Sequence, residues 1–84
     1  MFFNFTKEKI FFTHHLFLMI RGGLPISEAL ETLKEEAKSK SFKKALDDVL
    51  KRVLEGESLN KSLARHPKIF DQFFQNIIKI GEES

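Results

Sequence analysis

Three histidines are the first side chains in this 84-residue sequence to consider for chemistry: His14, His15 and His66. His14 and His15 are adjacent, so on a helix their side chains diverge by about 100° and do not converge on one metal ion as residues four apart would. We interpret both as surface or core-edge residues. His66 falls in the last turn of a short predicted helix, where its cationic form favours the C-terminal end of the helix dipole. Capping is therefore a better interpretation of His66 than catalysis.

Four lysines gather around a predicted connection between helices: Lys38, Lys40, Lys43 and Lys44. A solvated basic loop is the ordinary interpretation of such a group, and contact with phosphate or an acidic partner is the alternative. In that alternative, Lys43 and Lys44 are the candidate contact residues. The formal charge is only +2, from 14 basic and 12 acidic residues. This balance argues against a nucleic-acid-binding domain, which usually concentrates basic charge on one face.

Carboxylates offer no better candidates for catalysis. Glu82 and Glu83 follow Gly81 at the end of the sequence, with no second acid or histidine placed beside them to form an acid–base pair. The sequence contains no cysteine, which removes disulfides and thiolate metal sites. We therefore predict no catalytic residue, no metal site and no cofactor.

Helical periodicity runs through the chain and no segment alternates with a period of two, so we expect an all-α fold without a sheet. The predicted helices cover roughly residues 7–21, 25–38, 40–53, 59–65 and 71–81. Ser39 or Ser41 is expected to cap the third of them. Eighty-four residues suffice for one small domain, residues 1–84. We predict a small antiparallel bundle of about five helices.

The first predicted helix is apolar on nearly every side between Ile10 and Ile20. A helix with that pattern is usually covered on several sides, so we expect it to be the central helix. The run is well short of the ~20 residues that cross a bilayer. The residues before it lack the basic segment and cleavage site of a signal peptide. We therefore predict a core helix rather than a membrane anchor.

Charged residues are expected to mark the solvent face of the third helix. Asp47 with Lys51, and Asp48 with Arg52, are i, i+4 pairs in the favourable acid-first order. The buried stripe of the same helix is predicted to be Phe42, Leu46, Val49, Leu50 and Val53. The fifth helix is predicted to begin near Asp71.

The segment around Gly56 contains a helix end, a short connection and a helix start. Gly56 is placed where a left-handed residue closes a helix without a Cβ penalty. Ser58 offers its hydroxyl to the N–H groups of the next turn. Leu59 begins an apolar ridge that Pro67 ends, because proline does not continue a helix. Pro25 is expected near the first position of the second helix, where proline is favoured.

The sequence around Gly23 echoes this segment at an offset of 33 residues. The aligned pairs are Gly23 with Gly56, Ile26 with Leu59, Ala29 with Ser62 and Leu30 with Leu63. Such a period is typical of helical-repeat adaptors, although those folds need about three or more units to bury a continuous core. A helical-repeat adaptor therefore stays open as an alternative function, beside a small nucleic-acid-binding helical domain.

Three motifs give the chain a resemblance to a known family. Residues 12–16 (FTHHL) and 22–26 (GGLPI) form the first, residues 53–67 with the pattern V-x-x-G-x-S-L and a downstream proline form the second, and residues 81–84 (GEES) form the third. In this order and spacing they resemble the cytoplasmic domain of the type II secretion system F family. The motif positions are interpreted as residues that maintain the fold: Gly23, Pro25, Gly56, Ser58, Leu59, Pro67, Gly81 and Glu82.

The resemblance implies a bundle of six helices, of which this chain would lack the sixth. It also implies a non-catalytic scaffold on the cytoplasmic side of the bacterial inner membrane. Such a scaffold docks the assembly ATPase and other inner-membrane components of a type II secretion, type IV pilus or competence machine. The membrane spans implied by the family would lie in segments that this chain does not contain.

We expect the large apolar side chains on the first and fifth helices to be too numerous for five short helices to cover. Those expected to need further neighbours are Phe11, Phe17, Phe73, Phe74, Ile77 and Ile78. A contiguous exposed apolar patch normally marks an interface, and identical chains commonly cover such a patch through a two-fold contact. We therefore predict a homodimer or higher assembly built from the fifth helix and part of the first.

Overall fold

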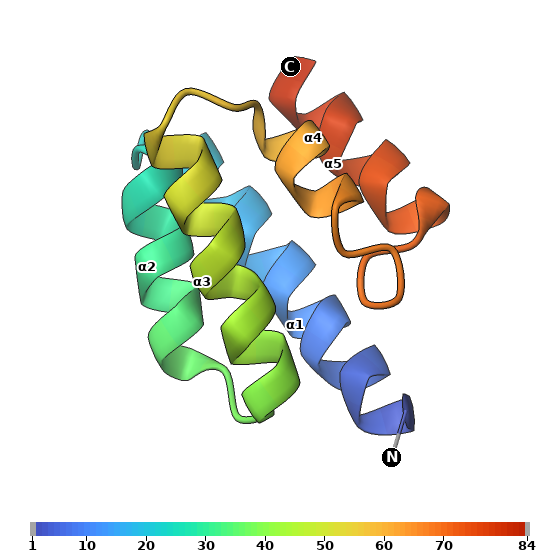
Figure 1. Ribbon diagram of the computed structural model, residues 1–84. Coiled ribbons are helices and arrows are strands. Elements are labelled where there is room, and N and C mark those ends of the chain that lie inside the picture. The colour runs from blue at the N-terminus through green and yellow to red at the C-terminus, as the bar shows by residue number, and fades with distance from the viewer. Residues whose placement is uncertain (1, 84) are drawn as a thin grey trace.

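The computed structural model describes the backbone of residues 2–83 and the side chains of residues 7–72, 74–76 and 79–80. The described residues form five helices and no strand, which confirms the all-α prediction. The helices are α1 (Phe2–Arg21), α2 (Ile26–Glu36), α3 (Lys40–Leu54), α4 (Leu59–Ala64) and α5 (Gln72–Glu83). Successive helices alternate in direction, as Figure 1 shows. None of the described helices is both long and apolar enough to cross a membrane.

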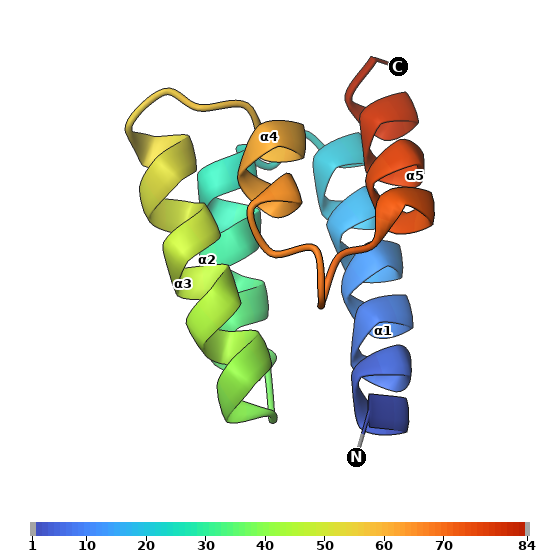
Figure 2. The same cartoon turned by 45° about the vertical axis from the view of Figure 1, so that its right-hand side comes forward.

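The five helices form a closed ring of neighbours. Each helix packs on the next in the chain, and α5 returns to pack on α1; Figure 2 shows these two helices side by side. Four phenylalanine side chains meet in the core between the helices: Phe12 of α1, Phe42 of α3, Phe70 of the α4–α5 loop and Phe74 of α5. The centroids of the contacting aromatic rings lie 5.0 to 5.7 Å apart. Such offset and edge-to-face pairs stabilise a core beyond their area of burial.

The prediction that the first helix is central is wrong. α1 begins earlier than expected, at Phe2, and it buries Phe12 and Leu16 completely. Its opposite face is left in water: Ile10 is 66% exposed, Phe11 50%, Phe17 42% and Leu18 52%. The apolar residues go around the helix, but its contacts, mainly with α2 and α5, leave these four side chains exposed. Composition shows that a helix is apolar all round, whereas the number of neighbouring helices decides how much of it is buried.

The connection between α2 and α3 covers residues 37–39 and is longer than predicted. α2 ends at Glu36, because Ala37 turns to an extended conformation where the sequence analysis expected helix to about Lys38. The Glu8 carboxylate of α1 accepts hydrogen bonds through Oε2 from the backbone N–H groups of Lys38 (2.8 Å) and Ser39 (3.1 Å). Ser39, one of the two expected caps, accepts from the N–H of Phe42 at 3.3 Å.

The same turn closes both α1 and α3. At Gly23, φ is 94°, and at Gly56 it is 106°. The N–H of Gly23 bonds to the Ile20 carbonyl and that of Leu24 to Met19. The N–H of Gly56 likewise bonds to Val53, and that of Glu57 to Arg52. These are two Schellman motifs, in which a residue with positive φ satisfies the last carbonyls of the helix.

We expect Gly56→Ala to lower the free energy of unfolding by about 1 to 2 kcal/mol, because an L side chain at positive φ is strained. A Cβ at this position would meet no atom within 4 Å, so the cost comes from the backbone alone. Gly22→Ala is the control: its φ is not positive, and its Cβ would make ordinary contacts with the Leu18 and Met19 carbonyls at 3.4 and 3.5 Å. Urea denaturation of the two variants measures the difference. Equal losses in both would contradict the assignment of strain to Gly56.

Candidate functional site

The residues at the starts of α2 and α4 stabilise these helices and the core. Pro25 precedes the first residue of α2, with φ −58° and ψ 144°, and its carbonyl accepts from the N–H of Ala29 at 3.0 Å. Ser58 Oγ accepts from the N–H of Lys61 at 3.1 Å and caps α4. Leu59, the first residue of α4, is 1% exposed. These groups take part in helix starts and core packing.

A polar junction ties the α3–α4 connection to the end of α4. The Glu57 carboxylate accepts from Arg65 Nη2 at 2.7 Å and from Arg65 Nε at 3.0 Å. It also accepts from the buried hydroxyl of Ser62 at 2.9 Å. Hydrogen bonds from Arg65 and then Ser62 lower the pKa of Glu57 from 4.5 to about 2, because both stabilise the charged carboxylate. The same contact raises the pKa of Arg65.

A second carboxylate, Asp48, joins α3 to the loop after α4. Its Oδ2 accepts from Arg52 Nε at 2.9 Å and lies 2.7 Å from His66 Nε2. The hydrogen bonds from Arg52 and then His66 lower the pKa of Asp48. The His66 ring therefore contacts α3. His66 lies beyond the last turn of α4, in which it was expected, because Arg65 is the C-cap. α4 ends at Ala64, and Pro67 lies exposed in the loop that follows.

The expected pairing along the solvent face of α3 is half right. Asp48 and Arg52 pair as predicted, at 2.9 Å, with 36% and 35% of their side chains exposed; Asp48 also contacts His66. Asp47 pairs with Lys34 of α2 at 3.2 Å, where the sequence analysis expected Lys51. The spacing along one helix shows which residues are able to meet, whereas a neighbouring helix can offer a nearer partner.

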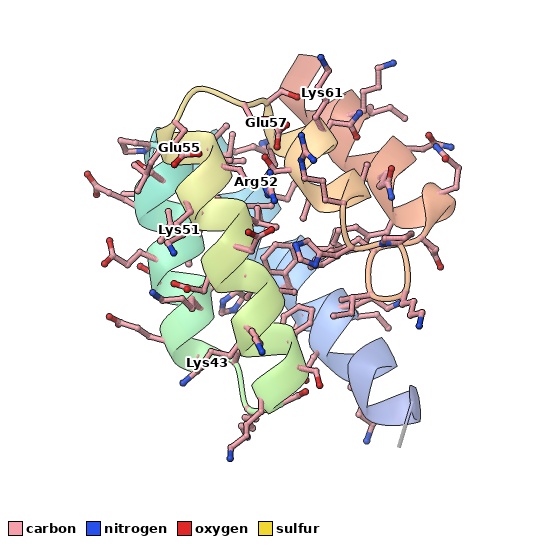
Figure 3. The ribbon with its side chains drawn as sticks, in the orientation of Figure 1. Lys43, Lys51, Arg52, Glu55, Glu57 and Lys61 are labelled. Atoms are coloured by element: carbon pink, nitrogen blue, oxygen red, sulfur yellow. The ribbon has the colours of Figure 1, made fainter. Side chains whose placement is uncertain are left out.

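The four lysines of the basic group are all exposed and lie around the start of α3. Lys43 and Lys44 form no ion pair with any described residue. Figure 3 shows Lys43 at one end of α3, while Arg52 and Glu55 lie toward the other end. The basic end of the molecule is thus separate from the polar junction at Glu57.

His14 and His15 lie on α1, outside any cluster of ligands. His14 is exposed, and the ring of His15 lies 4.0 Å from that of Phe11. His15 Nδ1 is 3.6 Å from Glu36 Oε1. In the part of the chain that the structure describes, no three His, Cys, Asp or Glu side chains are grouped as metal ligands.

The sequence model of the family described as type II secretion system (T2SS), protein F, matches residues 12–84 of this chain. The chain belongs to this family. The matched residues include both glycine turns and the polar junction of Glu57 and Asp48.

Curated relatives carry names from two kinds of machine. The chain is 34% identical over 79 residues to "Type II secretion system protein F" of Aeromonas hydrophila, which covers 94% of this chain and 20% of the relative. It is 33% identical over 76 residues to "Type IV pilus assembly protein PilC" of Myxococcus xanthus, covering 90% of this chain and 18% of the relative. A PilC of Thermus thermophilus is 30% identical over 78 residues, covering 93% and 19%. The chain thus spans about a fifth of the length of these relatives.

Gly81 and Glu82 belong to the last turn of α5, but their side chains lie outside the described residues. Whether these two positions of the third T2SS protein F motif pack or bind therefore stays a prediction. The same limit applies to the expected interface residues Phe73, Ile77 and Ile78.

Glu57, which organises the polar junction, was not among the candidate residues in the sequence, and Asp48 was expected to pair only with Arg52. One signal was available: Glu57 stands directly before the helix-capping Ser58, and Arg65 follows at the end of the same short helix. Because α4 has only six residues, the long side chains of Glu57 and Arg65 at its two ends are able to form an ion pair. The second partner of Asp48, His66, could not be predicted from sequence spacing, because it lies 18 residues away along the chain.

We expect Glu57→Gln to destabilise the fold at neutral pH and to have little effect near pH 2. The folded-state pKa of about 2 lies below the usual value of 4.5, so ionised Glu57 stabilises the fold above that usual value. This contribution is lost as pH falls from about 4.5 through about 2. Urea denaturation of both chains across this pH range measures the difference.

The matched control is Glu55→Gln, two residues away and exposed. Figure 3 shows both glutamates beside the α3–α4 connection. Glu55 makes no ion pair with a described residue, so its substitution removes one carboxylate without breaking the junction. A pH-independent difference for Glu57→Gln would show that the junction contributes nothing through charge.

Proposed function

We propose that this chain is a non-catalytic scaffold domain of a platform protein for type II secretion or type IV pilus assembly. In this role it docks the assembly ATPase and other inner-membrane components of the machine. It acts on the cytoplasmic side of the bacterial inner membrane, and other segments of the platform protein span that membrane. The observation that carries the proposal is the match of residues 12–84 to the T2SS protein F family.

The use of the charged side chains supports a scaffold rather than an enzyme. The two carboxylates with lowered pKa values are both satisfied by neighbouring side chains: Glu57 by Arg65 and Ser62, and Asp48 by Arg52 and His66. Ion pairs and hydrogen bonds that hold elements together also perturb pKa values. Here the geometry explains each lowered pKa without a substrate.

Lys43 and Lys44 are the candidate contacts for the ATPase. They lie on the exposed side of α3, whose other side contributes Phe42, Leu46 and Val49 to the core. Exposed charges affect the rate and specificity of association without being needed for packing. A docking surface made of such residues can therefore change without loss of the fold.

We expect the double variant Lys43→Glu/Lys44→Glu to capture several-fold less of the cognate assembly ATPase in a pull-down, because the charge of the surface is reversed. The helical circular dichroism should be unchanged. Lys61→Glu/Lys68→Glu is the control, since it changes the net charge equally at two other exposed lysines. Unchanged capture by the first variant, or equal loss in both, would rule out Lys43 and Lys44 as the docking surface.

A second copy of the chain is the other partner that we propose. The exposed face of α1 presents Ile10, Phe11, Phe17 and Leu18, which supports the expected participation of the first helix. The expected participation of Phe74 is wrong, since this ring is 6% exposed and belongs to the core. Phe74 therefore drops out of the proposed interface, and the participation of the rest of α5 stays a prediction.

We expect the chain to sediment as a dimer or higher assembly at high micromolar concentration and to dissociate on dilution. Leu18→Glu should shift it to monomer, because a charge placed in an apolar interface must be desolvated. Leu54→Glu is the matched control: Leu54 is 66% exposed at the end of α3. A parent chain that stays monomeric throughout the dilution series would refute the proposed interface.

A further inference from the structure

A hollow of about 500 Å³ opens between the first half of α1, the end of α2 and the start of α3. Its floor is apolar and includes the buried side chains of Phe12, Leu33 and Phe42. Phe11, half exposed, and Ala37 also line it. Ligand-binding pockets are typically about 300 to 1,000 Å³ with apolar walls and few polar groups, and this hollow has that size and character.

Glu8 supplies a polar wall whose hydrogen bonding is incomplete. Its Oε2 accepts from the backbone N–H groups of Lys38 and Ser39. Its Oε1 is buried and has no hydrogen-bond partner among the described residues. A buried acceptor without a donor is costly, and this one belongs to a side chain that lines an apolar hollow. An incoming group with an N–H or O–H would supply the missing donor.

The surroundings of the hollow carry an excess of positive charge. Lys7 and Lys38 line it and are exposed, and they are balanced by Glu8 and Glu36 in the same lining. The excess comes from the neighbouring start of α3. Lys40, Lys43 and Lys44 follow in the first turns of α3, and none of these five lysines pairs with a described carboxylate. The first turn of α3 contains no acidic residue, although the helix dipole would favour one there. The charge is therefore complementary to an acidic partner.

We propose that this hollow binds an acidic segment of a partner protein through one tryptophan or tyrosine side chain. The ring packs on the apolar floor, its N–H or O–H donates to the free oxygen of Glu8, and flanking carboxylates face the lysines. Tryptophan and tyrosine combine a large apolar surface with one hydrogen-bond donor, which matches the two kinds of wall. The inference rests on the proposed scaffold function only for the source of the segment, another component of the machine.

The composition of the chain makes the test direct. The sequence contains no tryptophan and no tyrosine, so the indole fluorescence of a bound peptide is read without background from the protein. The probe is a short peptide with a single tryptophan flanked by aspartates, titrated with the 84-residue chain. The reference peptide carries the same tryptophan flanked by lysines. We expect a saturable blue shift for the acidic peptide, weakened by salt, and none for the basic one.

Two variants separate the floor of the hollow from its polar wall. Ala37→Leu places a larger side chain in the hollow without changing charge, and we expect it to raise the Kd of the acidic peptide by about tenfold or more. Glu8→Gln keeps one oxygen to accept from Lys38 and Ser39 but replaces the free oxygen with a donor. We expect it to weaken the tryptophan peptide several-fold and to leave unchanged a peptide whose indole nitrogen is methylated. Circular dichroism checks that each variant folds, and Lys61→Glu is the control for charge away from the hollow.

The outcomes are distinct from those of the ATPase experiment. The absence of a blue shift with the acidic peptide, or binding that Ala37→Leu does not change, would overturn the proposed hollow. Equal effects of Glu8→Gln on the normal and methylated peptides would overturn the hydrogen bond to Glu8. If the peptide binds as expected while Lys43→Glu/Lys44→Glu leaves ATPase capture unchanged, the proposed ATPase surface fails and the peptide site stands.

Discussion

The contact of four phenylalanine rings at the centre of the helix ring is the constraint on which the structure depends. Phe12, Phe42, Phe70 and Phe74 come from α1, α3, the loop after α4, and α5. Phe70 is fully buried although it lies outside any helix. Because each ring is held by residues distant in the sequence, the cluster fixes the position of elements that have little local stability of their own. The six-residue α4 is the shortest of these elements. It is held by its own buried Leu59 and Leu63 and by the ion pair of Glu57 with Arg65.

Much of this fold could be predicted from local patterns, because caps and helix ends are local physics. Gly56, Ser58 and Ser39 act within a few residues, and the five helices follow from the apolar spacing. The errors concern contacts between elements. α1 is apolar all round, yet only its neighbours decide that Phe12 is buried and Leu18 is not. The site was predictable only as exposed lysines: neither the hollow beside Glu8 nor the contact of His66 with Asp48 has a signal in sequence spacing, since each joins residues brought together by the packing of helices.

The two glycine connections show how one local solution is used twice with different chemistry. Both end a helix with a Schellman motif. In both, the next helix starts three residues after the turn glycine, at Ile26 and at Leu59. At the third helical position beyond these, Ala29 in the first copy corresponds to Ser62 in the second, and both are fully buried. The hydroxyl of Ser62 needs acceptors there, and the Ser58 carbonyl and Glu57 supply them at 2.9 Å each. The second connection is therefore stabilised by a polar network where the first relies on apolar packing.

The return of α5 to α1 also determines how the domain would respond to mechanical force. The two helices run in the same direction, and the start of α1 and the end of α5 lie toward opposite ends of the molecule (Figure 1), whose longest extent is 33 Å. Tension applied between these ends slides α5 along α1 in shear, so that the contacts between the two helices are strained together rather than opened one after another. A domain arranged in this way transmits a pull along its long axis before it yields.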